Sequence, residues 1–299
     1  MFDRIAQTVS YQSLALEMPV QVTIKRLDQI HPQISGNKFF KLKYNLLEAQ
    51  KQAAKKIITF GGAYSNHIAA TAYASHLFGF ESIGIIRGEE LADKPLNNTL
   101  STAQQFGMQL QFVSRKKYRQ KESEGFLQQL KQDHADAYIV PEGGSNDLAI
   151  LGCQEILSDD DLKHYDVICC AVGTGGTILG LIEASLNHQT ILGFSALKGD
   201  FLQKEIPLKT KKSNWGITDD YCFGGYAKTT PELFEFIESF EQQYQIPLEQ
   251  IYTGKMLFGL FDLIEKNYFA KNIRILVIHS GGLQGRKMPF SDSTQPSHR

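Results

Sequence analysis

The sequence has no apolar run of the roughly 20 residues that a membrane-spanning helix requires, and its first segment, MFDRIAQTVSYQS, lacks the apolar core of a signal peptide. It has no strong charge of either sign: 31 Lys and Arg oppose 32 Asp and Glu, so no basic field would attract nucleic acid. Only four cysteines occur, without the spacing of metal ligands, and Cys169 and Cys170 lie in an apolar segment where they resemble small hydrophobic residues. We therefore expect a cytoplasmic protein with no metal site, no membrane span and no nucleic-acid partner.

The composition that remains, 42% hydrophobic and 21% charged, is ordinary for a globular enzyme of 299 residues. Short, continuous apolar segments alternate with segments of helical periodicity, which is typical of parallel strands covered by helices on both faces. The predicted strands are 57–60, 82–88, 110–113, 137–140, 167–172, 191–197 and 274–280, and the predicted helices are 38–54, 66–78, 96–106, 118–133, 148–156, 177–187, 231–244 and 255–267. The pattern predicts an α/β fold, and the polar tail 291–299 is expected to fray.

Ligands in such folds bind where strands end and helices begin, and three junctions have suitable residues. In ITFGGAYSNHIAA, Ser65 and Asn66 open a helix after two glycines, where free backbone amides attract an anion. The alternative is that one of them is only a helix cap, and the segment alone favours neither interpretation. In RILVIHSGGLQG, Ser280 can hydrogen-bond to a ligand, whereas His279 is expected to be structural.

The third junction has the composition of a phosphate-binding loop. In ICCAVGTGGTILG, the residues between strand and helix are Gly173, Thr174, Gly175, Gly176 and Thr177. They offer exposed N–H groups, two hydroxyl donors and a helix N-terminus. Ile178 stands where the dinucleotide fingerprint needs its last glycine, and no lysine precedes Thr177 as in a Walker loop. A tight turn that binds nothing is the alternative.

The segment SGNKFFKLKYN places Lys38 at the start of a helix, where a cation is unfavourable. Lys41 and Lys43, in the next turn, are expected to be solvated. A phosphate loop together with a lysine in this position suggests pyridoxal 5′-phosphate, which needs a lysine for a Schiff base, a phosphate site and a partner for its ring nitrogen. The helix N-terminus would lower the pKa of Lys38 and so favour the neutral nucleophile. An ordinary surface lysine is the alternative for this segment taken alone.

Six motifs follow one another along the chain: SGNKFFKLKYN, GGAYSNH, GTGGT, GGYAK, YTGK and HSGG. Each is weak singly, but in this order they resemble the pyridoxal-phosphate family that contains 1-aminocyclopropane-1-carboxylate deaminase and D-cysteine desulfhydrase, over about residues 20–285. The resemblance implies a two-domain fold like the β-subunit of tryptophan synthase, usually a homodimer. The implied small α/β domain, 52–152, is inserted in a large domain formed by 1–51 and 153–299, with the cofactor between them.

The resemblance also implies roles for individual residues. The implied catalytic residues are Lys38, which forms the Schiff base, Ser65, Tyr226 and Tyr252. The implied substrate-binding residues are Ser65, Asn66, His67, Tyr226 and Tyr252. The cofactor would be bound by Lys38, Asn66 beside its 3-hydroxyl, the phosphate loop Gly173, Thr174, Gly175, Gly176 and Thr177, and Ser280.

Four departures from the motifs of the family bear on the substrate. The ring-opening deaminases carry glutamate directly after the tyrosine that corresponds to Tyr252, and leucine in the H-x-G-G motif; this chain has Thr253 and Ser280, hydroxyl residues as in D-cysteine desulfhydrases. A hydroxyl leaves the cofactor ring closer to neutral than a carboxylate does, which favours β-elimination over ring opening. Tyr64 replaces the glutamine common before the S-N pair, and the lead-in KRLDQIHPQISGNK lacks the usual acidic pattern.

The prediction is therefore β-elimination from a small amino acid, most like D-cysteine desulfhydrase. Deamination of 1-aminocyclopropane-1-carboxylate is the alternative within the family. A pyridoxal-phosphate carrier with little turnover is an alternative of another class, and without the resemblance a nucleotide-binding protein would be the interpretation.

Overall fold

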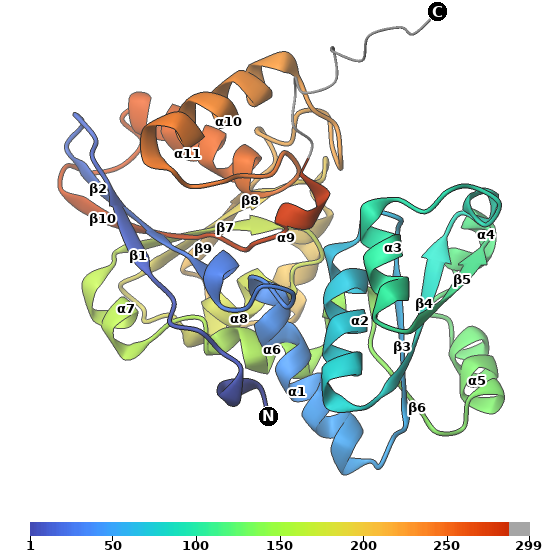
Figure 1. Ribbon diagram of the computed structural model, residues 1–299. Helices are drawn as coiled ribbons and strands as arrows, with labels where there is room; N and C mark the ends of the chain where they lie inside the picture. Colours follow the sequence, from blue (N-terminus) through green and yellow to red (C-terminus); the bar gives the residue numbers. More distant parts are fainter. Residues whose placement is uncertain (287–299) are drawn as a thin grey trace, which may run out of the picture.

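The structure, a computed structural model, describes residues 1–286, and two β-sheets form its framework (Figure 1). The larger sheet has six strands in the order β1-β2-β10-β7-β8-β9, and all its pairs are parallel except β1 with β2. Its strands are Tyr11–Leu14, Val20–Lys25, Ile273–Ile278, Val167–Val172, Thr190–Ser195 and Trp215–Thr218. The predicted tail 291–299 lies outside the described residues.

The central strand β7 explains why the larger sheet is covered on both faces. All six residues of VICCAV are buried, so neither face of the strand meets water. Ile168 and Cys170 belong to one hydrophobic cluster, whereas Val167 and Cys169 belong to another on the opposite face. The helices are α1 (Asn37–Lys51), α6 (Asp147–Gln154) and α8 (Gly176–Ala184) on one face, and α10 (Pro231–Tyr244) and α11 (Thr253–Glu265) on the other. The four cysteines are all buried and free.

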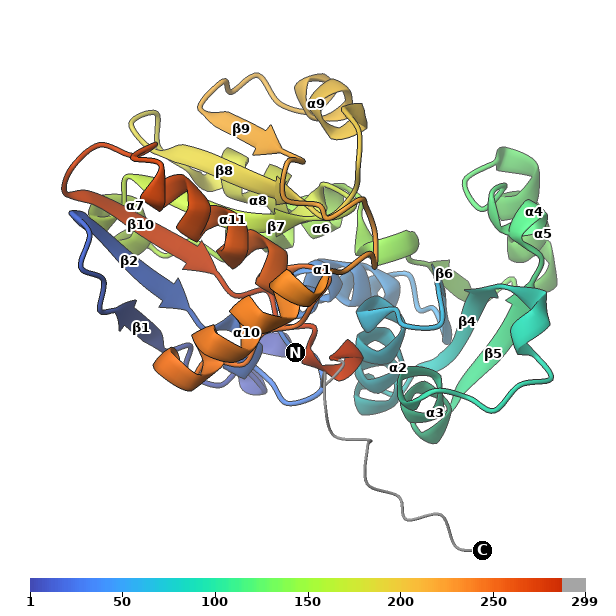
Figure 2. The same ribbon diagram turned by 90° about the horizontal axis from the view of Figure 1, so that it is seen from above.

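The smaller sheet has four parallel strands in the order β5-β4-β3-β6. They are Met108–Val113, Glu81–Arg87, Lys56–Gly61 and Ala137–Ile139. One hydrophobic cluster packs α2 (Asn66–Phe78) and α3 (Asn98–Gln105) against one face, and a second packs α4 (Arg115–Tyr118) and α5 (Glu124–Asp133) against the other. Figure 2 shows this sheet and its helices to one side of the larger sheet.

The helix α6 follows the small sheet in the chain but packs on helices of the large one. A Cβ at Gly152 would lie 2.1 Å from the carbonyl oxygen of Phe40 in α1, and one at Gly180 of α8 would lie 2.3 Å from Cβ of Cys153. Both glycines therefore allow helices to approach closely. The predicted domain boundaries at 51/52 and 152/153 remain a proposal, and these contacts favour a second boundary before α6.

The α/β fold class is confirmed, with differences at the sheet edges. The predicted helix 118–133 is two helices, α4 and α5, and the strands β1, β2 and β9 were not predicted. The short helices α7 (Asp159–His164) and α9 (Phe201–Glu205) were also missed. Within residues 1–286, no helix has both the length and the apolar composition to cross a membrane.

Candidate active site

A cavity of about 420 Å³ lies where both sheets direct the carboxyl ends of their strands, as expected for parallel α/β sheets. Eleven of the predicted site residues line the cavity: Lys38, Ser65, Asn66, His67, Gly173, Thr174, Gly175, Thr177, Tyr226, Tyr252 and Ser280. Only Gly176 among the predicted residues is not in its wall; a Cβ there would meet Ser145 Oγ at 2.9 Å and Lys41 Nζ at 3.1 Å.

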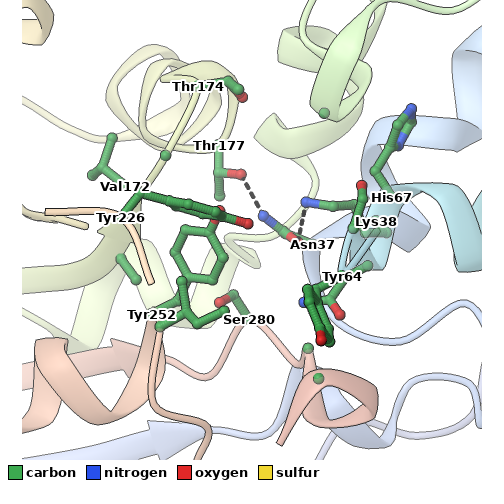
Figure 3. A pocket seen from close by; sticks show the side chains of 18 of the residues that line it. Asn37, Lys38, Tyr64, His67, Val172, Thr174, Thr177, Tyr226, Tyr252 and Ser280 are labelled. Atoms are coloured by element: carbon green, nitrogen blue, oxygen red, sulfur yellow. Dashed lines mark hydrogen bonds between the residues drawn. The ribbon is translucent and has the colours of Figure 1, made fainter. Parts of the chain in front are cut away.

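Lys38 lies in the first turn of α1 and is connected by hydrogen bonds to the phosphate-binding candidate. The Lys38 amino group donates to Asn37 Oδ1 at 3.2 Å, and Asn37 Nδ2 donates to Thr177 Oγ1 at 2.8 Å (Figure 3). The Thr177 oxygen thus accepts from Asn37, and Thr177 itself lines the cavity. Gly36, the N-cap of α1, has φ 66, which allows the chain to turn into the helix at this point.

The pKa of Lys38 is lowered to about 7 by burial and, secondly, by the charge of Lys41. The direction is the one that the sequence predicted, but the sequence argument used only the helix N-terminus. An amine with a pKa near 7 is substantially unprotonated at neutral pH and can act as a nucleophile or a base.

Lys41 is a site residue that the sequence interpretation missed. It is only 2% exposed, so the expectation that it is solvated is wrong. Its amino group donates to the carbonyl oxygen of Gly143 and to Ser145 Oγ, both at 3.1 Å, and lies 3.4 Å from Thr174 Oγ1. A usable signal was present: Lys41 is three residues after Lys38 and therefore on the same face of α1.

The loop 173–177 has the properties of an anion site. Gly175 is the N-cap of α8 and has φ 83°. Because glycine has no side chain that could accept from the first amides of the helix, these amides receive no hydrogen bond from the N-cap residue. The buried Lys41 places positive charge beside these amides, and the hydroxyl groups of Thr174 and Thr177 line the cavity. A helix N-terminus with a buried cation favours a phosphate group.

Ser65, Asn66 and His67 form the wall on the side of the smaller sheet. Ser65 is indeed the N-cap of α2, since its oxygen accepts from the Ile68 amide at 3.3 Å, and it also lines the cavity. Capping uses an acceptor, so the hydroxyl proton remains available. The Oδ1 of Asn66 is buried and has no hydrogen-bond partner among the described residues.

His67 is 2% exposed and is held as the neutral imidazole. Thr59 Oγ1 donates to the Val140 carbonyl at 2.9 Å, so it must accept from His67 Nε2 at 2.8 Å. Burial, followed by the charges of Lys38 and Lys41, holds the pKa of His67 well below its usual value. Its Nδ1 has no partner among the described residues and remains an acceptor.

Two tyrosines from separate segments meet on the side of the larger sheet. The rings of Tyr226 and Tyr252 are 6.2 Å apart at an interplanar angle of 63° (Figure 3). A Cβ at Gly173 would lie 3.2 Å from the Tyr252 hydroxyl, so this hydroxyl lies beside the loop 173–177. Burial raises the pKa of both phenols, which are therefore proton donors at neutral pH.

Thr253 and Ser280, the two hydroxyl residues on which the prediction of the reaction depends, lie in different places. Ser280 lines the cavity, whereas Thr253 is fully buried and is not in the wall. The Thr253 hydroxyl lies 3.2 Å from Oε1 of the buried Glu249, and the same oxygen accepts from the amides of Tyr252 and Thr253. Glu249 therefore caps the start of α11, a function that its position in the sequence did not indicate.

The site contains two further charged residues that the sequence interpretation did not name. Arg87 ends β4 and lines the cavity, with its guanidinium 5.9 Å from the ring centre of Tyr118. Glu142 follows β6 and accepts from the Tyr118 hydroxyl at 2.7 Å, with Lys121 at 3.3 Å. Both follow the rule that side chains at the carboxyl ends of parallel strands form the site, and this rule could have found them.

His279 is structural as predicted: it is fully buried, its Nε2 bonds to the Pro247 carbonyl at 2.7 Å and its Nδ1 accepts from the Gly281 amide.

Comparison with known proteins decides the family. Residues 3–281 match the family model described as "Pyridoxal-phosphate dependent enzyme". The chain belongs to this family. A Thermotoga maritima protein named "Putative 1-aminocyclopropane-1-carboxylate deaminase" is 32% identical over 285 residues, covering 88% of this chain and 89% of that protein. An Arabidopsis thaliana protein named bifunctional D-cysteine desulfhydrase/1-aminocyclopropane-1-carboxylate deaminase, mitochondrial, is 31% identical over 293 residues, covering 89% of this chain and 73% of that protein.

A solved structure described as an ACC deaminase homologue superimposes on this pyridoxal-phosphate-dependent enzyme with a TM-score of 0.81 at 27% identity, covering 94% of this chain and 91% of that one. The cofactor predicted from the sequence is thus the cofactor of the family. The cavity suits it, because the amides of 173–177 and the buried Lys41 match a phosphate, and the buried, unpartnered Asn66 Oδ1 can accept from a ring hydroxyl.

Proposed function

We propose that this enzyme is a pyridoxal-phosphate-dependent lyase of the D-cysteine desulfhydrase type, which converts a small β-substituted amino acid to a 2-oxo acid. For D-cysteine, one water is consumed, and pyruvate, ammonia and hydrogen sulfide are released. The family and its relatives support the coarser part, an enzyme of amino-acid chemistry. We also propose a homodimer, on the resemblance alone.

The observation that carries the choice of reaction is the set of groups at the wall formed by residues 249–252, just before α11, and the loop after β10. Ser280 presents a hydroxyl to the cavity. Glu249 also borders the cavity, but its two carboxylate oxygens accept from the backbone amides of residues 251–253. If Ser280 lies at the ring nitrogen, a hydroxyl in place of a carboxylate would make the cofactor a modest electron sink, which would be sufficient to lose a thiol from the β-carbon.

The other residues receive roles that their geometry permits. When bound, the cofactor withdraws electrons from the α-carbon of the substrate. The neutral Lys38 amine would accept the α-proton, consistent with its pKa of about 7. Ser65 and the first amides of α2 would bind the α-carboxylate. The phenol of Tyr226 or Tyr252 would donate a proton to the departing sulfur.

A substrate panel tests the proposal. The holoenzyme is incubated with D-cysteine, L-cysteine and 1-aminocyclopropane-1-carboxylate, and pyruvate, sulfide and 2-oxobutyrate are measured. We expect pyruvate and sulfide in equal amounts from D-cysteine, and little 2-oxobutyrate. Ser280→Ala should slow elimination while the visible absorbance of the cofactor linked to Lys38 persists. Efficient formation of 2-oxobutyrate without sulfide from either cysteine would instead assign the ring-opening reaction, and no turnover of any substrate would favour a carrier.

A further inference from the structure

Lys255, the lysine of the YTGK motif, is buried away from the cavity. It is 2% exposed and is absent from the cavity wall. Its amino group donates to two backbone carbonyls, those of Cys222 at 2.7 Å and Gly225 at 2.9 Å. Both carbonyls belong to the segment that precedes Tyr226 in the GGYAK motif, so one side chain connects two motifs that are distant in the sequence.

Besides the bonds from Lys255, the segment 222–228 is held by the ring of Phe223, which packs against Phe258 of α11 at 5.0 Å between centroids, and by two turns. Its internal backbone bonds are Gly225 N to Cys222 O at 3.0 Å and Lys228 N to Gly225 O at 3.2 Å, so each carbonyl that Lys255 binds also closes a turn. Positive φ angles occur on both sides of Tyr226: 52° at Phe223, 86° at Gly224, 120° at Gly225 and 57° at Ala227. Non-glycine residues adopt this region at a cost, and they persist there only when the surroundings hold them.

Lys255 is also placed in a fixed relation to the second tyrosine. Tyr252 is the N-cap of α11, and Lys255 lies in the first turn of the same helix. The helix therefore carries Tyr252 directly and holds the Tyr226 segment through Lys255. The contact between the tyrosine rings, 6.2 Å between centroids, therefore joins α11 to a segment that Lys255 also binds.

We propose that Lys255 is a positioning residue that sets Tyr226 against Tyr252 and the cavity. It touches neither substrate nor cofactor; it acts through the carbonyl groups of Cys222 and Gly225. This inference rests on the proposed function only in that Tyr226 serves the reaction, and the position of the segment can be measured without turnover.

The first test measures the segment directly, by hydrogen exchange and mass spectrometry of the protein without cofactor. In Lys255→Met, a variant of similar length without charge, we expect exchange in residues 221–228 to rise about tenfold or more, because two hydrogen bonds from a charged donor are lost. Exchange in α10, residues 231–244, should stay unchanged. Equal acceleration in both regions, or in neither, would overturn the proposal.

The second test is a double-mutant cycle on kcat/KM with D-cysteine. Lys255→Met should lower kcat/KM about tenfold or more, with the absorbance of the bound cofactor retained. In a Tyr226→Phe background the same change should have little further effect, since Lys255 acts through Tyr226. Fully additive losses would mean that Lys255 supports only general stability, and would contradict the proposal.

Lys266 provides the matched control. It lies just beyond the end of the same helix, and its exposed amino group pairs with Asp262 at 2.6 Å. Since Asp262 also accepts from Tyr221, Lys266→Met is compared over residues 222–228, where it should change neither exchange nor kcat/KM. If Lys255→Met does not yield folded protein, Lys255→Gln, which keeps a donor but is shorter, is carried through both tests with the same criteria. Failure of the wild-type enzyme to use D-cysteine would refute the proposed function and leave the exchange experiment to decide the role of Lys255.

Discussion

Lys38 should make the stability of the protein without cofactor depend on pH. Its pKa falls from an ordinary 10.5 to about 7 in the folded protein. Between these two values the unfolded chain binds a proton that the folded chain does not, so the free energy of unfolding should rise with pH across this window. Below pH 7 both states are protonated, and this contribution becomes constant.

We expect Lys38→Ala to reduce this rise and to abolish the visible absorbance of bound pyridoxal phosphate. Urea unfolding of the apoprotein at a series of pH values checks the first expectation. The charge of Lys41 is the second cause of the lowered pKa of Lys38, so Lys41→Met should raise this pKa. The pH at which an amine reagent labels Lys38 at half its maximal rate should rise accordingly. A borohydride-reducible linkage in Lys38→Ala would assign the cofactor to another lysine.

The residues that the sequence identified, and those that it missed, differ in a physical way. Ser65, Thr177 and Ser280 were named because they stand with glycines at the carboxyl ends of strands, where ligands bind in such folds, and because the six motifs occur in the order of the family. Lys41 was missed because a charged residue on a helix is normally solvated, and burial depends on the neighbouring loop 143–145. Glu249 was missed because its partners are backbone amides, which leave no trace in the side-chain pattern.

At the scale of elements, the continuous apolar strands were predicted well and the edge strands were not. The strand β7 has six buried residues in succession, and the short apolar run bounded by turn residues is typical of a strand buried on both faces. The strands β1 and β9 are the outer strands of the large sheet and are only partly buried, so their apolar signal is weak. The strand β2 contains Lys25, a charged residue that interrupts the apolar pattern although its position is buried. Its amino group pairs with Asp161 at 2.5 Å, which neutralises the charge.

The junction before α1 can be tested with one methyl group. A Cβ at Gly36, where φ is 66°, would lie 1.8 Å from the carbonyl oxygen of Ser280. Gly36→Ala should therefore cost more than the roughly 1–2 kcal/mol of left-handed strain, and should weaken cofactor retention, because Ser280 and Lys38 would both be displaced. Urea unfolding and the cofactor dissociation constant measure the two effects.

Gly79 is the control for this substitution. It caps the end of α2 with φ 79°, and an added Cβ would have no atom within 4 Å. Gly79→Ala should show the strain alone, with cofactor affinity unchanged. Equal losses in both variants would mean that the contact between Gly36 and Ser280 adds nothing to the strain.

At the scale of the whole molecule, residues from both sheets form the wall of the cavity, and one hydrophobic cluster joins Ile57 of β3 and Ala70 of α2 to the helices of the large sheet. Ser65 and Arg87 in its wall follow or end strands of the small sheet, whereas Thr177 and Ser280 follow strands of the large one. A ligand that contacts both walls stabilises both units at once, and the gain follows mass action.

We therefore expect removal of pyridoxal phosphate to lower the Tm of the entire protein. Free cofactor at 100 times its Kd adds about 2.7 kcal/mol, equivalent to roughly 4 °C for a chain of 299 residues. Inorganic phosphate added to the apoprotein should recover only part of this shift, because it can occupy the loop 173–177 of the large sheet without contacting Ser65. Thr177→Val should reduce the phosphate effect, since it removes one donor to a charged group. Calorimetry of the holoprotein, apoprotein and phosphate-loaded protein gives the three Tm values. A phosphate shift as large as the cofactor shift would mean that the stabilisation comes from the loop alone, and that the ligand does not link the two sheets.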